Sequence, residues 1–360
     1  MTARTYTVPA PLGSTPARVG VPAGRRTERL LLVSPAFHGY HRSIARAWAQ
    51  QGFDVTVHCY DAYATPAMKL RNKALLELPQ RVGMDRTAAR VAWDTQRAVA
   101  ALREARPDRV LVIKGDSLGE QFWDEVRALG VPRMLWLYDD LHRHDYSLDF
   151  LRTVGPVLSY ARSEADELTA DGVDAHYLPN GFDPDLDVPP LERRDELVFV
   201  GSRYPNRVEL LERLAAAGIP VRAYGRQWSH HPVDRLRTWE LRRPALPAER
   251  DIPLNEAYAV QAAAAGAINV HGLQAGHAMR TFEVPGMGGL QLVDRADVAE
   301  FYEPGAEVLV FESPEHLVEL GSRAVREPAW GERIRAAGRR RSHAEHTFAH
   351  RAAAAQDWWT

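Results

Sequence analysis

The stretch RLLLVS at residues 29–34 contains four consecutive apolar residues. Such an uninterrupted apolar run is typical of a parallel β-strand that is buried on both faces of its sheet. A second run of this kind, RVLVI, stands at residues 109–113, and the apolar residues of 87–105 between them recur at helical spacing. Strands that alternate with helices predict βαβ crossovers and therefore an α/β fold with a doubly wound parallel sheet.

The alternation breaks once and then resumes. Residues 179–190, PNGFDPDLDVPP, carry four prolines and three acidic residues, and such a stretch continues neither a helix nor a central strand. A strand at 197–200, a helix at 207–217 and a strand at 221–224 begin a second alternation, whereas 230–253 is expected to be irregular. Because 360 residues also exceed the usual size of one hydrophobic core, two domains are expected. The predicted parts are an N-terminal Rossmann-like domain (1–184), a C-terminal Rossmann-like domain (185–345) and a C-terminal helix (346–360) that can pack back on the first domain.

Composition excludes several classes of protein. The 45 basic and 47 acidic residues give a net charge of −2, which provides no basic surplus for nucleic acid. Cys59 is the single cysteine, so neither an intramolecular disulfide nor a thiolate metal cluster can form. No run reaches the ~18 apolar residues of a membrane span, and residues 1–24 lack the apolar core of a signal peptide. We therefore expect a cytoplasmic protein.

The best local signal for a ligand site follows the strand at 197–200. Gly201 comes directly after that strand, where a glycine lets the backbone approach a ligand closely. The next helix offers free N–H groups at its start, and Arg203 and Arg207 can form charge-assisted bonds to a diphosphate. A tight turn with surface arginines is the alternative interpretation.

Polar residues gather again near a second strand end. Asn269 and His271 follow a predicted strand, and Arg280, Thr281 and Glu283 lie at the start of the next predicted helix. Glu283 is placed to accept hydrogen bonds from two neighbouring hydroxyls, such as a ribose diol. Alternatively, Glu283 interacts only with the helix dipole and His271 is a core histidine. The convergence of these polar groups favours a ligand site.

In the N-terminal half, His38, Lys114–Asp116 and the pair Asp139 and Asp140 follow predicted strands. His38 is our candidate general base, because the usual pKa of histidine suits proton transfer near neutrality. Asp139 or Asp140 would orient His38 or serve as the base, although one of the pair can instead cap a helix. No HExxH motif is present, and we predict no bound metal.

The C-terminal half resembles a known family. The segments that carry the resemblance are VGSRYPNRVELLERL (200–214), GIPVRAYGRQW (218–228), YAVQAAAAGAINVH (258–271), the long stretch from HAMRTFEVPGMGG onward (277–320) and AGRRRSHAEHTFAHR (337–351). Together they resemble the glycosyltransferase family of the spore-maturation protein CgeB.

This resemblance implies a GT-B fold, in which two Rossmann-like domains face each other across a cleft. It also implies a nucleotide-sugar donor on the C-terminal domain, an acceptor on the N-terminal one and transfer without metal or cofactor. By position, Gly201, Arg203 and Arg207 would meet the diphosphate, Tyr224, Gly225 and Trp228 would lie near the base, and Glu283 would bind the ribose. Related retaining enzymes carry a first glutamate eight positions before that one, where this chain has Ala275. His271 and His277 are the candidates to take over its contacts.

We therefore expect a glycosyltransferase that uses a nucleoside-diphosphate sugar, with uridine favoured as the base. Its acceptor would be a small molecule, a glycan or a peptide, and the protein would be a monomer or a homodimer. Two alternatives stay open, namely a nucleotide-sugar 2-epimerase and a non-catalytic nucleotide- or sugar-binding protein of cell-surface assembly.

Overall fold

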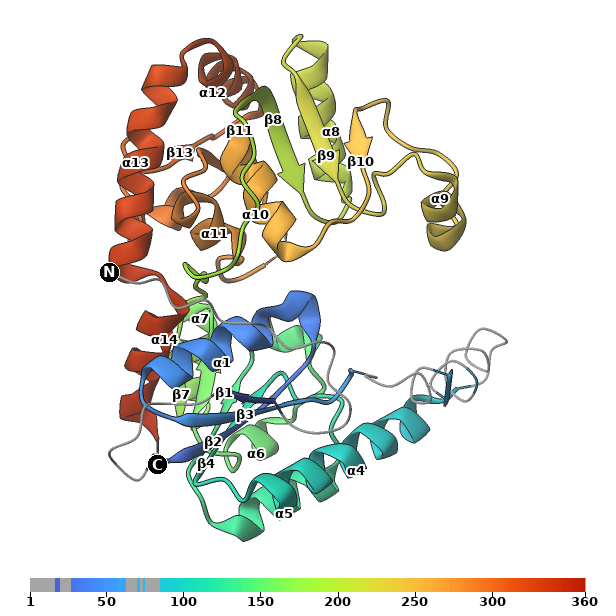
Figure 1. The fold of residues 1–360 in the computed structure, drawn as a ribbon, viewed down its shortest axis with the longest axis vertical. Helices are drawn as coiled ribbons and strands as arrows, with labels where there is room; N and C mark the ends of the chain where they lie inside the picture. The colour runs from blue at the N-terminus through green and yellow to red at the C-terminus, as the bar shows by residue number, and fades with distance from the viewer. Residues whose placement is uncertain are drawn as a thin grey trace. The chain divides into compact units, whose positions relative to one another are not determined.

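The computed structural model describes residues 17–19, 27–62, 70–71, 74, 85–272 and 274–359. The described chain divides into two compact units. One extends to Leu178 and includes residues 352–359, and the other is Pro179–Arg351. Each unit has its own mainly parallel sheet flanked by helices (Figure 1). The two doubly wound, Rossmann-like domains predicted from the sequence are therefore confirmed.

The first unit contains a seven-stranded sheet in the order β1-β3-β2-β4-β5-β6-β7. Its strands are β1 (Ala17–Val19), β2 (Arg29–Ser34), β3 (Asp54–Cys59), β4 (Arg109–Ile113), β5 (Arg133–Trp136), β6 (Val157–Ser159) and β7 (Ala175–Tyr177). Only the edge strand β1 is antiparallel to its neighbour. The chain winds in one direction from β2 to β3 and in the other from β4 onward, so the topological switch point lies between β2 and β4. Ligands of such sheets bind at this point, outside the carboxyl ends of the strands.

Helices cover both faces of this sheet. They are α1 (Tyr40–Gln50), α4 (Thr87–Ala105), α5 (Glu120–Leu129), α6 (Leu148–Leu151) and α7 (Arg162–Ala170). Helix α1 lies on one face, and α4 and α5 lie on the other (Figure 1). The core under α4 and α5 includes Leu31, Val112 and Phe122, which is why the apolar runs of β2 and β4 could be recognised in the sequence.

The second unit contains a six-stranded parallel sheet in the order β10-β9-β8-β11-β12-β13. Its strands are β8 (Arg194–Val200), β9 (Val221–Tyr224), β10 (Ala248–Glu249), β11 (Ala264–Asn269), β12 (Gln291–Val293) and β13 (Leu309–Val310). Strands β9 and β10 follow β8 on one side of the sheet, and β11, β12 and β13 lie on the other. The switch point of this sheet therefore lies between β8 and β11.

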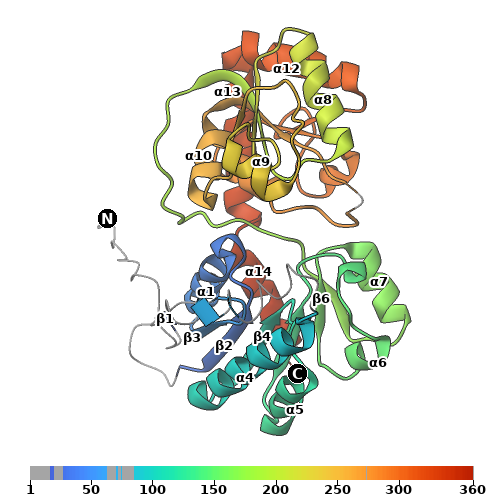
Figure 2. The same ribbon diagram turned by 90° about the vertical axis from the view of Figure 1, so that its right-hand side faces the viewer.

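The helices of this unit also form a layer on each side of the sheet. They are α8 (Pro205–Ala216), α9 (Pro232–Thr238), α10 (Leu254–Ala263), α11 (Arg280–Gly286), α12 (Pro314–Arg326) and α13 (Pro328–Glu345). Figure 2 shows α8 and α12 on one side and α10 on the other. Helices α8, α12 and α13 each have proline in their first turn, where the missing N–H of proline costs no intrahelical bond.

The structure differs from the sequence prediction at the boundary between the halves. The division falls after Leu178 instead of residue 184, because the next residues pair with a distant segment of the second unit. The Phe182 N–H donates to the His346 carbonyl, at 3.1 Å, and the Phe348 N–H donates back to the Phe182 carbonyl, at 2.9 Å. Phe182 is fully buried there.

Two further segments depart from the expected elements. The stretch 230–253 is not wholly irregular, because it contains α9 and β10. The last helix, α14 (Phe348–Ala355), is followed by a 3-10 turn at Gln356–Trp358. In the first unit, Trp359 packs on Trp48 with ring centroids 5.5 Å apart.

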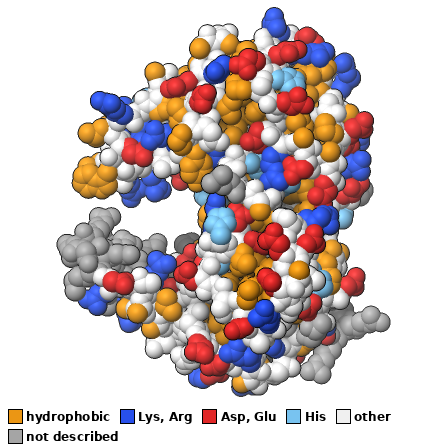
Figure 3. Space-filling view, turned by 180° about the vertical axis from the view of Figure 1, so that it is seen from behind, with side chains coloured by type: hydrophobic (Ala, Val, Ile, Leu, Met, Phe, Trp, Pro, Cys, Tyr) orange, Lys and Arg blue, Asp and Glu red, His pale blue; other side chains and the backbone are white. Residues whose placement is uncertain are grey.

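The surface shows no concentration of one charge on the face drawn in Figure 3, where basic and acidic side chains are interspersed. Among the described residues, no helix combines the length and the apolar character needed to cross a bilayer.

Candidate functional site

The switch point of the second unit is bridged by one buried arginine. Arg207, in the first turn of α8, donates from Nη1 to the Ser202 carbonyl, at 3.0 Å, and from Nη2 and Nε to the Val270 carbonyl, at 2.7 and 3.2 Å. Ser202 follows β8 and Val270 follows β11, so this guanidinium fixes the two strand ends relative to each other. These ends are where an open α/β sheet receives its ligand.

Two glycines let the backbone pack closely beside this arginine. Gly201 and Gly225 have φ values of +150° and +147°, a region that side chains with a Cβ rarely adopt. The Trp228 indole N–H donates to the Gly201 carbonyl, at 2.9 Å. Trp228 is almost fully buried, so its ring supports the glycine turn from inside the unit.

Positive charge accumulates at the same place. Within the described part of the chain, the buried Arg207 forms no ion pair with a carboxylate. Burial and the neighbouring Arg280 charge lower the pKa of Arg207 to about 10, so it remains charged at neutral pH. The Arg280 guanidinium itself donates to the Val200 carbonyl at the end of β8. Two arginines this close repel each other, and an anionic ligand would relieve that repulsion.

His271 is held in one orientation at the end of β11. Its Nδ1 lies 2.9 Å from Asp294 Oδ1, and its backbone N–H donates to both Asp294 oxygens, each at 3.0 Å. The Ala278 N–H donates to His271 Nε2, at 3.4 Å. These contacts hold the imidazole ring between Asp294 and the backbone that precedes α11.

A buried hydrogen-bond network lies behind His271. The Asn269 amide donates to Thr281 Oγ1, at 3.1 Å, and to Gln291 Oε1, at 3.2 Å. Asn269, Thr281 and Gln291 are all fully buried. This network joins β11, α11 and β12, and it rigidifies the elements that carry His271 and Arg280.

Glu283 is a buried carboxylate on α11. Its Oε1 accepts a hydrogen bond from the Tyr258 hydroxyl of α10, at 3.1 Å, and only 5% of Glu283 is exposed. An acid this buried requires hydrogen-bond donors. The Tyr258 hydroxyl is one such donor.

His277 is buried beside His271, and the centroids of the two rings lie 5.3 Å apart. Its Nε2 lies 3.2 Å from Asp297 Oδ1, although the alignment is not that of a hydrogen bond. Burial, together with the charge of Arg295, lowers the pKa of His277 to about 4. The ring is therefore neutral at physiological pH and can offer hydrogen bonds without a charge.

The remaining predicted donor residues have intramolecular partners. Arg203 forms an ion pair with Glu240, at 2.5 Å, and Glu240 also binds Arg243, at 2.7 Å. Tyr224 is buried, and its hydroxyl accepts a hydrogen bond from Arg194, at 3.4 Å. Neither the Tyr224 ring nor the Trp228 ring exposes a face on which a base could stack.

The switch point of the first unit carries the other predicted residues. His38 follows β2, is exposed, and adopts a positive φ of 45°. Lys114 follows β4 with a φ of 60°, and Tyr138 follows β5 with a φ of 65°. Left-handed backbone at such residues is uncommon, and it clusters at functional sites.

The two aspartates after β5 differ in their surroundings. Asp139 pairs with Lys114, at 3.1 Å, and lies 3.5 Å from Arg143. Asp140 is almost fully buried and accepts a hydrogen bond from the Tyr160 hydroxyl, at 2.6 Å. Among the described residues, the His38 ring contacts the rings of Phe37 and Tyr40. The role of an aspartate in orienting His38 stays a prediction.

The structure thus brings together Gly201, Arg207, His271 and Arg280 at the switch point of the second unit. Glu283 lies on the same helix as Arg280, and its carboxylate contacts Tyr258. The sequence reasoning missed the partners Asp294 and Tyr258. Asp294 was detectable in principle, because it directly follows a buried strand in the same way as the residues that were chosen.

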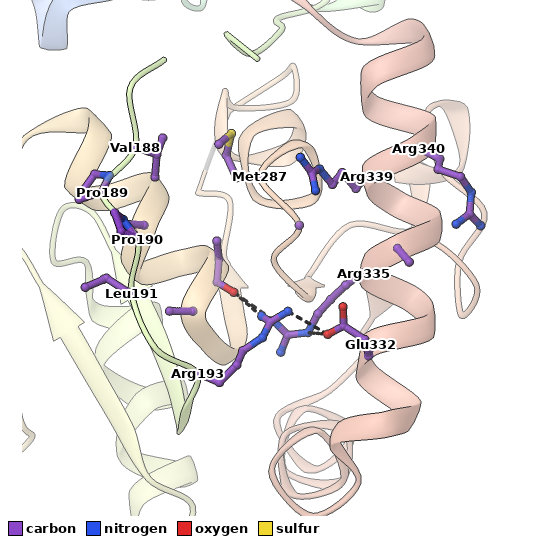
Figure 4. A pocket seen from close by; sticks show the side chains of 15 residues that line it. Val188, Pro189, Pro190, Leu191, Arg193, Met287, Glu332, Arg335, Arg339 and Arg340 are labelled. Atoms are coloured by element: carbon purple, nitrogen blue, oxygen red, sulfur yellow. Dashed lines mark hydrogen bonds and ion pairs between the residues drawn. The ribbon is translucent and has the colours of Figure 1, made fainter. Parts of the chain in front are cut away.

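A separate cavity of about 610 Å³ lies elsewhere in the second unit (Figure 4). Its lining residues come from the segment before β8, from α10, from the turn after α11 and from α13. Arg335 there donates to the carbonyls of Ala264 and Ala265, at the start of β11. The cavity therefore lies at the amino ends of the strands, away from the switch-point residues.

Comparisons with known proteins agree with this geometry. Residues 203–357 match the family described as glycosyl transferase-like. The spore protein CgeB of Bacillus subtilis (strain 168) is 22% identical over 156 residues, which are 37% of this chain and 46% of CgeB. The match thus spans less than half of that curated relative.

The fold is shared with solved glycosyltransferase structures over most of the chain. A glycosyltransferase from Rickettsia africae ESF-5 matches 92% of this chain and 98% of its own, with a TM-score of 0.59 and 10% identity. Anabaena Alr3699/HepE, solved in complex with UDP-glucose, matches with the same coverage and TM-score at 12% identity. The match to CgeB supports the resemblance predicted from the sequence, and the chain has the GT-B fold of these solved glycosyltransferases.

Proposed function

We propose that the protein transfers a sugar from a nucleoside-diphosphate donor, with a UDP-sugar favoured, to an acceptor hydroxyl. The observation that carries this proposal is the buried Arg207 at the switch point of the second unit. It is charged, it has Arg280 as a neighbour, and it forms no ion pair with a carboxylate among the described residues. A diphosphate supplies the negative charge that this arrangement lacks.

The other donor contacts follow from the same geometry. The turn at Gly201 lets the diphosphate approach the backbone after β8 closely. Glu283 accepts hydrogen bonds from the ribose diol. His271 and His277 face the donor sugar or its diphosphate as neutral donors or acceptors. The crystal structure of HepE with UDP-glucose supports a uridine nucleotide as the first donor to test.

The proposed transfer uses no metal ion. A departing nucleoside diphosphate needs positive charge, which a divalent cation supplies in many enzymes. Here Arg207 and Arg280 supply it from the protein side. Activity that survives removal of divalent cations would support this part of the proposal.

The acceptor would bind to the first unit, with His38 as the general base that removes the proton of its hydroxyl. His38 is exposed after β2 at the switch point, and Asp139 or Asp140 would take over this role if His38 does not hold it. The structural neighbours do not identify the acceptor, which we propose to be a small molecule, a glycan or a peptide.

The direct test is the release of nucleoside diphosphate from a panel of nucleotide sugars by the purified chain, with EDTA present. Arg207→Met removes the central charge, and Leu129→Ser changes an exposed residue at the end of α5 as a matched control. We expect diphosphate release by the wild-type chain and the control and a strong loss in Arg207→Met.

Three other outcomes would each contradict part of the proposal. Epimerisation of the donor sugar without an acceptor would identify a 2-epimerase. Tight nucleotide binding without turnover would identify a non-catalytic binding protein. Activity that depends on an added divalent cation would overturn the metal-independent mechanism.

A further inference from the structure

The strongest unexplained feature lies outside the donor residues, on the segment from Val233 to Arg242, which we call the outer segment. It comprises α9 and the residues after it, and it lies beyond β10, the edge strand of the second sheet (Figure 1). Large apolar side chains on this segment face solvent. Leu236 is 64% exposed, Trp239 is 84% exposed and Leu241 is 75% exposed.

The acidic and the basic residues of the outer segment differ in their surroundings. Both of its acidic residues are paired with arginines. Asp234 is buried and accepts two hydrogen bonds from Arg250, at 2.8 and 3.1 Å, and the partly exposed Glu240 binds Arg203 and Arg243. Arg237 and Arg242, in contrast, are exposed. The solvent face therefore combines apolar and cationic side chains, and the carboxylates of the segment are neutralised by ion pairs.

The backbone keeps the tryptophan on this face. Trp239 has a φ of 56°, a left-handed conformation that is rare for a bulky residue and costs free energy. A protein that needed only a stable fold would gain by burying this indole. In the space-filling view, hydrophobic side chains stand at the outer edge of this region (Figure 3).

We propose that the outer segment docks the protein on the surface of an anionic lipid bilayer. Leucine and tryptophan side chains insert at the boundary between headgroups and acyl chains, where the indole is favoured. Arginines at the same level bind anionic headgroups. The ion pairs of Asp234 and Glu240 offset the negative charges that would oppose this contact. The remaining positive charge of the face favours an anionic membrane surface over a neutral partner.

The position of the segment has a consequence for the donor residues. Arg203, three residues after the end of β8, forms an ion pair with Glu240. This ion pair links the outer segment to the turn that carries Gly201. Docking would therefore place the donor residues of the second unit close to the bilayer surface.

Vesicle flotation of the full chain tests the proposal, with phosphatidylcholine vesicles that contain or lack phosphatidylglycerol. The triple variant Leu236→Ser, Trp239→Ser and Leu241→Ser removes the apolar face. Its control is Leu129→Ser with Leu148→Ser, which are exposed leucines of the first unit. The double variant Arg237→Glu and Arg242→Glu reverses the cationic face, and Arg333→Glu with Arg340→Glu on α13 is its control.

We expect the wild-type chain to float with the anionic vesicles and not with the neutral ones. Each outer-segment variant should reduce the bound fraction by roughly tenfold or more, and neither control should change it. Circular dichroism and thermal unfolding verify that every variant is folded.

Equal binding to neutral vesicles, or binding that the outer-segment variants leave intact, would overturn the proposal. So would a wild-type chain that ignores vesicles but forms a dimer in sedimentation velocity that Trp239→Ser dissociates. That last result would identify a second copy as the occupant. None of these measurements depends on glycosyl transfer, so they are independent of the proposed function.

Discussion

A Cβ atom added at Gly225 would lie 2.8 Å from the carbonyl oxygen of Gly201. The two glycines follow neighbouring strands, β9 and β8, and their turns press together at the edge of the sheet where the proposed diphosphate binds. The contact is between backbone atoms, which cannot rotate away from an added methyl group. Close backbone packing here keeps the turn after β8 in one shape.

Gly225→Ala should therefore destabilise the second unit. The residue combines a φ of +147° with this backbone contact, and we expect a loss of about 1–3 kcal/mol from strain, with a similar further loss from overpacking. Gly218→Ala is the matched control, because Gly218 has a φ of +76° but open space around its Cα. Urea unfolding gives the free energy of unfolding of both variants. Equal losses of stability in the two would mean that the contact with Gly201 has no energetic role.

Glu283→Ala should weaken the binding of a nucleoside diphosphate. If this carboxylate binds the ribose diol, its loss costs about 1–3 kcal/mol, the scale for a hydrogen bond to a charged group. Tyr258→Phe removes only the hydroxyl that donates a hydrogen bond to this carboxylate. This variant should therefore weaken nucleotide binding less than Glu283→Ala does. Isothermal titration measures both variants, and an unchanged affinity in Glu283→Ala would refute the ribose assignment.

His38→Ala should abolish transfer and leave nucleotide affinity intact. A general base typically contributes about 10²–10⁴-fold to the rate, and His38 belongs to the first unit while the proposed nucleotide contacts belong to the second. Leu129→Ala, at an exposed position at the end of α5, is the control. Full turnover by His38→Ala would move the role to Asp139 or Asp140, and their alanine variants would then be tested by the same assay.

The buried His277 makes stability depend on pH. Its pKa is about 4 in the folded chain against the ordinary 6.5, so between these values the unfolded chain binds a proton that the folded chain does not. The free energy of unfolding should therefore fall as the pH drops from 6.5 toward 4, by up to about 1.4 kcal/mol per pH unit for this group.

The substitution His277→Gln tests that contribution. It should reduce the slope of stability against pH in this window, as measured by urea unfolding at several pH values. His142→Gln, at an exposed histidine of the first unit, is the control. A slope that is the same in both variants and in the wild-type chain would show that His277 does not titrate as described.

Much of the fold could be predicted because it depends on local patterns. The strands β2 and β4 are continuous apolar runs, and burial on both faces of a sheet produces that pattern directly. The short helix α9 was missed because Pro232 opens it, three of its seven residues are charged, and its Leu236 faces solvent. No apolar periodicity marks such a helix.

The candidate site was predictable only in part. Gly201, Arg207 and His271 follow strands, so the rule for α/β sheets identified them. The pairing of His271 with Asp294 joins residues 23 positions apart, and that of Glu283 with Tyr258 joins two different helices. The ion pair between Arg203 and Glu240 depends on how residues 230–253 fold back on the sheet. Such contacts are set by tertiary packing, which a local pattern does not reveal.

The central claim is that the second unit binds the nucleoside diphosphate of a sugar donor. Thermal unfolding of the purified chain with UDP, dTDP, GDP, ADP or NAD tests it most directly, because a ligand that binds only the folded state raises its stability. We predict a clear rise in the melting temperature with one nucleoside diphosphate, UDP first, and a much smaller rise in Arg207→Met. The absence of any shift across the panel, or an equal shift in Arg207→Met, would contradict the claim.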